Sequence, residues 1–291
     1  RDCLLSRGLG DVYKRQAVEI ARKSDVAIVN IGFNESSERE SNDRPFELPE
    51  YQDSLVQCIT AANPNTVVLL NAGGNVDMSK WIDKVPSLLH LWYAGQEGGT
   101  AVAEILFGKV NPSGKLPISF EKKWEDNPAY PYYYDVDGDK RVEYKEGLFM
   151  GYRHYDVSET KPQFAFGYGM SYTTFKYSDL RIDREKGRDL VVKIRFTVKN
   201  TGKHDGAETA QIYIRPINPK VERPYKELKG FAKHFIRKNT VQEIEITLDK
   251  DAFSYYKTEL KDFDYDAGSY EVLVGSASDD IRLRKVIQIE K

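Results

Sequence analysis

The side chains best suited to chemistry in this chain lie in one loop, from Phe33 to Pro49. Its ionisable residues are Glu35, Glu38, Glu40, Asp43 and Glu47, with Arg39 and Arg44 among them. Carboxylates grouped in this way can act as acids, bases or nucleophiles in bond cleavage. An acidic loop can equally be a solvated surface feature that keeps a protein soluble. Composition alone leaves both interpretations open, so the position of the loop in the fold matters.

The loop follows a run of apolar residues from Asp25 to Gly32, which reads Asp-Val-Ala-Ile-Val-Asn-Ile-Gly. This run is apolar on both faces, which is typical of a parallel strand covered by helices on each side. Ligands of such sheets gather beyond the carboxyl ends of the strands. The sequence therefore predicts that the acidic loop occupies the usual place of an active site.

Helix and strand signals alternate around this strand. The pattern predicts the end of a helix from Ala17 to Ser24, a helix from Pro49 to Ala62, strands from Thr66 to Asn71 and from Ser87 to Trp92, and a helix from Thr100 to Phe107 that Gly108 stops. Strands separated by helices indicate a parallel, doubly wound α/β sheet. Only three strands are evident, which is few for a complete domain of this kind.

The pattern changes in the second half of the chain. Residues 123–178 are rich in glycine and aromatic residues and are predicted to be an extended connector. Its tyrosine cluster, Tyr130-Pro-Tyr-Tyr-Tyr134, either stacks on sugar rings or attaches the connector to the neighbouring domains. From residue 179 the hydrophobic period becomes two, as in Leu190, Val192, Ile194 and Phe196. Repeated short strands with turn signals predict an antiparallel β-sandwich of immunoglobulin or fibronectin size over residues 179–291.

Composition argues against several functions. The chain has 291 residues with a formal net charge of -2, so no basic field attracts nucleic acid. No apolar stretch approaches the roughly 20 residues that span a bilayer, so no membrane partner is predicted. The histidines and the two cysteines have no metal-ligand spacing, and the glycine-bearing turns match neither phosphate-binding motif. We predict neither a metal nor a cofactor.

The first 16 residues show neither helical nor strand periodicity and join abruptly to the amphipathic stretch that begins at Ala17. They resemble the translated adapter tails of metagenomic assemblies. We therefore treat residues 1–16 as a non-native tail and expect the natural protein to continue upstream of Ala17.

A series of motifs follows in one order along the chain. They are Glu40-Ser-Asn-Asp-Arg44 with Leu48-Pro49, Ala62-Asn-Pro-Asn-Thr-Val67, Trp92-Tyr-Ala-Gly-Gln-Glu-Gly-Gly99, Phe107-Gly-Lys-Val-Asn-Pro-Ser-Gly-Lys-Leu-Pro117, Tyr144-Lys-Glu-Gly-Leu148 with Gly151-Tyr-Arg153, and Phe166-Gly-Tyr-Gly-Met-Ser-Tyr-Thr-Thr-Phe175. This order closely resembles the carboxyl-terminal half of glycoside hydrolase family 3, of the bacterial β-glucosidase type. The resemblance covers residues 17–291 and implies a truncated α/β domain (17–122), a connector (123–178) and a fibronectin type III-like domain (179–291).

The resemblance implies a retaining, exo-acting β-glycosidase that hydrolyses terminal β-D-glucosyl residues of oligosaccharides without a cofactor. In this family an upstream (β/α)₈ barrel supplies an aspartate nucleophile, and the glutamate of a Glu-Gly-x-Asp-Arg loop is the acid/base. The matching residue here is Glu40, with Glu35 and Glu38 as fallback candidates, and Ser41 stands where the family has glycine. Asp43 and Arg44 are expected to hold the loop by an ion pair.

Because the barrel lies outside this sequence, we expect the isolated chain to be inactive, and the missing barrel is its expected intramolecular partner. The resemblance also favours a periplasmic or extracellular location. The alternative is a non-catalytic carbohydrate-binding or scaffolding module, in which the acidic loop and the tyrosines bind glycans.

Overall fold

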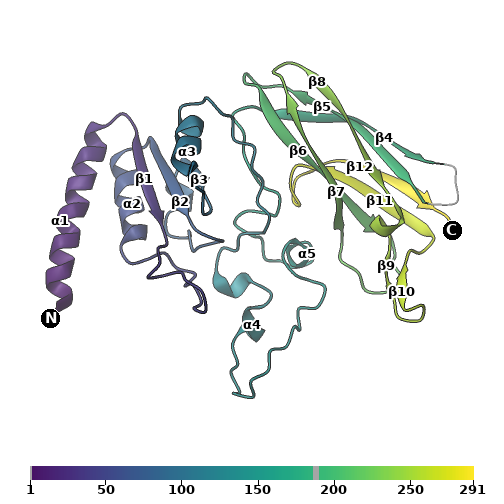
Figure 1. Ribbon diagram of the computed structural model, residues 1–291, viewed down its shortest axis with the longest axis horizontal. Coiled ribbons are helices and arrows are strands. Elements are labelled where there is room, and N and C mark those ends of the chain that lie inside the picture. The colour runs from purple at the N-terminus through teal and green to yellow at the C-terminus, as the bar shows by residue number, and fades with distance from the viewer. Residues whose placement is uncertain (1, 186–189) are drawn as a thin grey trace. The chain divides into compact units, whose positions relative to one another are not determined.

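The computed structural model describes residues 2–185 and 190–291, which form two compact units (Figure 1). The first unit comprises residues 1–104 and 121–124, and the second comprises residues 105–120 and 125–291. Among the described residues, no helix combines the length and apolar character needed to cross a bilayer.

The first unit is built on a three-stranded parallel sheet. Its strands β1 (Ala27–Gly32), β2 (Thr66–Asn71) and β3 (Ser87–His90) lie in the order β1-β2-β3. The helices α1 (Asp2–Lys23) and α2 (Gln52–Ala62) lie side by side in this unit (Figure 1). The buried side chain of Asn63 ties α1 to the start of β2 by donating to the carbonyl oxygens of Ala21 and Ser24. The predicted parallel α/β sheet is confirmed.

One face of the outer strand β1 differs from the prediction. Ala27, Val29 and Ile31 are buried, whereas Ile28 is 55 % exposed and Asn30 is exposed as well. The sequence predicted helices on both faces of this strand, and that prediction is wrong for this chain. The exposure of Ile28 shows that this face of β1 is not fully covered by the described residues.

The helix starts also differ from the prediction. Helix α1 begins at Asp2, so the stretch before Ala17 in which we found no periodicity is helical. Helix α2 begins at Gln52 instead of Pro49, after Tyr51 adopts a left-handed backbone with φ of 73°. The third helix, α3 (Gly98–Leu106), begins two residues before the predicted Thr100 and ends one residue before the predicted Phe107, shortly before Gly108, whose φ is 71°.

The second unit contains an antiparallel β-sandwich. One sheet has the order β12-β11-β6-β7 and the other has the order β4-β5-β8 (Figure 1). The strands are β4 (Phe175–Arg184), β5 (Val192–Asn200), β6 (Gly206–Pro216), β7 (Glu227–Ile236), β8 (Val241–Leu248), β11 (Gly268–Gly275) and β12 (Ile281–Ile289), with the small hairpin of β9 (Tyr255–Lys257) and β10 (Asp262–Asp264). Alternating residues such as Val192, Ile194 and Phe196 fill the core between the sheets, as their period of two predicted.

The connector is less extended than expected. It contains the single-turn helices α4 (Tyr130–Tyr133) and α5 (Tyr152–Tyr155) and a short 3₁₀ helix at Trp124–Asp126. Elsewhere in the described residues, short 3₁₀ helices lie at Ile82–Lys84 and Lys250–Ala252. The ring of Tyr152 lies 5.1 Å from that of Phe166 and 5.8 Å from that of Tyr213 on β6. The contact with Tyr213 joins Tyr152 of the connector to the sandwich.

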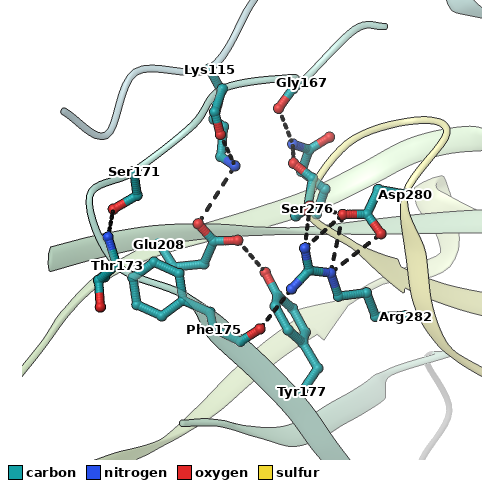
Figure 2. Close-up of polar contacts among 12 residues, drawn as sticks. Lys115, Gly167, Ser171, Thr173, Phe175, Tyr177, Glu208, Ser276, Asp280 and Arg282 are labelled. Atoms are coloured by element: carbon teal, nitrogen blue, oxygen red, sulfur yellow. Dashed lines mark hydrogen bonds and ion pairs between the residues drawn. The ribbon is translucent and has the colours of Figure 1, made fainter. Parts of the chain in front are cut away.

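Residues 105–120, which the sequence grouped with the first domain, pack within the second unit. The ammonium group of Lys115 lies 3.5 Å from the carboxylate of Glu208 on β6 (Figure 2). Glu208 is buried and also accepts a hydrogen bond of 2.8 Å from the hydroxyl of Tyr177 on β4. Arg282 stacks its guanidinium 5.1 Å from the ring centre of Tyr177 and binds Asp280. This polar cluster links the segment to both sheets.

Candidate active site

The acidic loop leaves β1 through a tightly fixed residue, Gly32. The side-chain amide of Gln52 accepts from the backbone N–H of Gly32 and donates to its carbonyl oxygen, both at 2.8 Å. The φ of Gly32 is 150°, and an added Cβ would overlap the carbonyl oxygen of Asn71 on β2. Only glycine fits there, so the loop begins from a fixed point at the carboxyl end of the sheet.

The segments that follow the three strands meet beyond their carboxyl ends, as expected for a parallel sheet. The loop after β1 contributes Glu38 and Arg44, the turn after β2 contributes Gly73 to Asn75, and the segment after β3 contributes Tyr93. His90, at the end of β3, lies with Nε2 3.2 Å from the carbonyl oxygen of Gly74.

Glu38 is the most firmly held carboxylate of the loop. Its Oε2 accepts a hydrogen bond from the hydroxyl of Tyr93 and lies 3.5 Å from Nε of Arg44. Its Oε1 packs against Gly73, where an added Cβ would come within 2.8 Å. The Glu38 side chain is 26 % exposed.

Glu40 lies at the tip of a tight turn and is exposed. A β-bridge joins Arg39 to Asn42, and the backbone N–H of Asn42 donates to the carbonyl oxygen of Arg39 at 3.3 Å. Ser41, which replaces the glycine of the family pattern, has a φ of 63° in the left-handed region. Within the part of the chain that the structure describes, the Glu40 side chain makes no hydrogen bond or ion pair.

Arg44 holds the loop through partners that the sequence did not indicate. Its Nη2 donates to the carbonyl oxygen of Asn75 at 2.7 Å, and its guanidinium lies 4.5 Å from the ring centre of Phe33. The ion pair expected between Asp43 and Arg44 does not form among the described residues, because Glu38 pairs with Arg44. Asp43 is exposed, and Glu35 is exposed on the outer part of the loop.

Burial also shapes the chemistry of His90. Desolvation lowers the pKa of this imidazole below its usual value, and the nearby charge of Arg44 lowers the pKa further. His90 and Tyr93 were missed because they are far from the loop in sequence. The topological rule that strand ends converge is the signal that could have indicated them, since both lie at or just after the end of β3.

A second group of carboxylates lies outside this site. The side-chain oxygens of Asp135, Asp137 and Asp139 in the connector lie within 4.8 Å of one another, and all three residues are exposed. The sequence predicted no metal site here. Exposed acidic turns commonly exist without an ion, so this cluster does not alter the candidate site.

Fold and site together define a class of protein. A parallel α/β unit with an acidic loop beyond its strands precedes a fibronectin-like sandwich in one chain. The glycosyl hydrolase family 3 C-terminal domain matches residues 7–172, and the fibronectin type III-like domain matches residues 208–278. The chain therefore belongs to glycosyl hydrolase family 3.

Curated relatives carry the same likeness over nearly the whole chain. Thermostable β-glucosidase B of Acetivibrio thermocellus is 42 % identical over 284 residues, which are 97 % of this chain and 37 % of the relative. The β-glucosidase of Kluyveromyces marxianus is 42 % identical over 95 % of this chain and 32 % of its own length. The chain thus spans about a third of the length of these relatives.

Solved structures agree with the fold. The crystal structure of the Kluyveromyces marxianus β-glucosidase in complex with glucose has a TM-score of 0.90 at 41 % identity and covers 97 % of this chain and 33 % of that chain. β-Glucosidase 3B of Thermotoga neapolitana, also solved with glucose, has a TM-score of 0.84 at 30 % identity, covering 96 % of this chain and 39 % of that chain.

Proposed function

We propose that this chain supplies the acid/base side of a retaining, exo-acting β-glycosidase that removes terminal β-D-glucosyl residues from oligosaccharides. Glu40 first protonates the oxygen of the leaving group and then deprotonates the attacking water. The nucleophile is an aspartate in a barrel domain outside this chain, and the reaction uses no cofactor.

One observation carries the proposal. The Glu40 carboxylate stands exposed at the tip of a turn whose base is fixed to the carboxyl ends of three strands. A carboxylate engaged by its own fold would have to break those contacts to protonate a substrate, whereas Glu40 has none to break in the described residues. The β-glucosidase relatives, which match this chain over nearly all its length, support the sugar and the reaction.

The chemistry explains why one chain segment is not sufficient. A retaining glycosidase needs two carboxyl groups about 5–5.5 Å apart on opposite sides of the anomeric carbon. We assign only one of them to this chain.

The test compares the chain alone with the chain in a complete enzyme. The 291-residue chain is expected to hydrolyse aryl β-glucosides at the background rate. Joining it to the remaining two thirds of the Kluyveromyces marxianus β-glucosidase is expected to produce turnover. If the isolated chain hydrolysed the substrate and Glu40→Gln abolished this activity, the proposed need for a nucleophile outside the chain would be refuted. If the isolated and the joined chain both bound an oligosaccharide specifically without hydrolysing it, a binding module would be favoured.

A further inference from the structure

We infer that Glu38 is a positioning residue that fixes the acid/base turn, and that Tyr93 and Arg44 hold it in place. The inference rests on the proposed function, because it assigns to Glu38 a role in the reaction of Glu40. Glu38 itself does not touch the substrate. Its carboxylate ties the acidic loop to the segments that follow the other two strands.

The contacts of Glu38 reach every segment at this end of the sheet. Tyr93 comes from the segment after β3 and donates its hydroxyl hydrogen to Oε2. Arg44, at the far end of the same turn, pairs with that oxygen and donates to the carbonyl oxygen of Asn75 after β2. Gly73 leaves the space that Oε1 occupies.

This arrangement closes the base of the turn. Glu38 precedes the turn and Arg44 follows it, so their ion pair joins the two points from which the chain leaves and returns. Glu40 and Ser41 lie between these points, with Ser41 in a left-handed backbone conformation. A charge-assisted contact at the base therefore limits the directions in which the Glu40 carboxylate can project.

The same contacts argue against Glu38 as the proton donor. Oε2 already accepts from Tyr93 and faces the guanidinium of Arg44, and Oε1 faces Gly73. Protonating a leaving group would require Glu38 to leave all three neighbours. An acid misplaced by about 1 Å can lose roughly a hundredfold in rate, so a residue that orients the acid matters without contacting the sugar.

The first experiment measures the anchor without any activity. Amide hydrogen exchange over residues 33–46 is followed in the 291-residue chain for Glu38→Gln, Tyr93→Phe, Glu40→Gln and the exposed control Glu47→Gln. We expect faster exchange in the first two variants and unchanged exchange in the last two. Equal exchange in all four variants would overturn the anchor, whatever the reaction of Glu40.

The second experiment measures catalysis in the chain joined to the remaining part of the Kluyveromyces marxianus enzyme. An alkyl β-glucoside needs protonation of its leaving group, whereas a dinitrophenyl β-glucoside does not. Glu38→Gln and Tyr93→Phe are expected to lower kcat for the alkyl glucoside about tenfold and to leave its KM within about twofold of the unsubstituted enzyme. The first-turnover rate on the dinitrophenyl glucoside is expected to stay within about twofold as well.

The outcomes separate the inference from the function it rests on. Equal losses on both substrates would show a merely structural role for Glu38 and overturn the inference. If azide restored the activity of Glu38→Ala while Glu40→Ala stayed fully active, Glu38 would be the acid/base and both proposals would be refuted. Loss in Glu40→Ala with full activity in Glu38→Gln would leave the proposed function standing and refute the positioning role alone.

Discussion

A pair of adjacent glycines offers a matched test of the site's geometry. A Cβ at Gly73 would lie 2.8 Å from Oε1 of Glu38 and 3.0 Å from the ring of Tyr93, whereas a Cβ at Gly74 would meet only Arg44 at 3.6 Å. Neither glycine has a positive φ, so alanine suits both backbones. Gly73→Ala should therefore disrupt the contacts of Glu38, and Gly74→Ala should not.

The expected magnitude follows from two opposing effects. Replacing glycine by alanine at a compatible site stabilises a protein by about 0.4–1 kcal/mol through the unfolded state. A hydrogen bond to a charged group contributes about 1.5–3 kcal/mol, and the lower end applies because Tyr93 is 55 % exposed. Gly74→Ala is thus expected to stabilise the chain, and Gly73→Ala to be less stable than Gly74→Ala by about 1.5 kcal/mol.

Urea unfolding of the 291-residue chain, followed by tryptophan fluorescence, measures this difference. Trp81 and Trp92 both lie in the unit that contains the site. Equal free energies of unfolding for the two variants would mean that Glu38 does not occupy the space beside Gly73. The structural basis for its anchoring role would then be wrong.

Three further perturbations test other parts of the structure. Lys115→Met leaves the buried carboxylate of Glu208 without its cation and is expected to cost about 3 kcal/mol in urea unfolding, but much less when Glu208→Leu is also present. Because the pKa of His90 is lowered in the folded chain, its contribution to folding stability is complete above the unfolded-state pKa of about 6.5 and is lost as the pH falls toward the folded-state pKa. His90→Gln should therefore flatten the fall in the urea midpoint below a pH of about 6.5. Ser41→Val should speed amide exchange of the turn, because a β-branched residue is strained at a φ of 63°, whereas Ser41→Gly should not.

The parallel sheet could be predicted from the sequence because burial determines the composition of its strands. Strand β2 forms over the predicted residues Thr66–Asn71. Because most of this strand is buried, its sequence is a continuous apolar run, which predicted the strand correctly. The strand from Glu227 to Ile236 gives no comparable signal. Phe231 and Phe235 are 68 % and 64 % exposed on its outer face, so apolar residues occur on both faces and hide the period of two.

Only part of the candidate site could be predicted from the sequence. Glu40 was selected by a local motif, which a sequence displays directly. The partners of the loop could not be predicted in this way, because the hydrogen bond between Glu38 and Tyr93 joins residues 55 positions apart and depends on the order of the strands. The expected pairing of Asp43 with Arg44 relied on sequence proximity, but Glu38 takes the guanidinium from across the turn.

The role of Glu40 is tested most directly by the response of Glu40→Ala to the leaving group and to azide, in the chain joined to the remaining part of the Kluyveromyces marxianus β-glucosidase. If Glu40 is the acid/base, Glu40→Ala loses about 10²–10⁴ in kcat/KM for an alkyl β-glucoside, keeps a near-normal first turnover of a dinitrophenyl β-glucoside, and forms β-glucosyl azide when azide is added. Unchanged hydrolysis of the alkyl glucoside by Glu40→Ala would contradict the assignment of Glu40 as the acid/base.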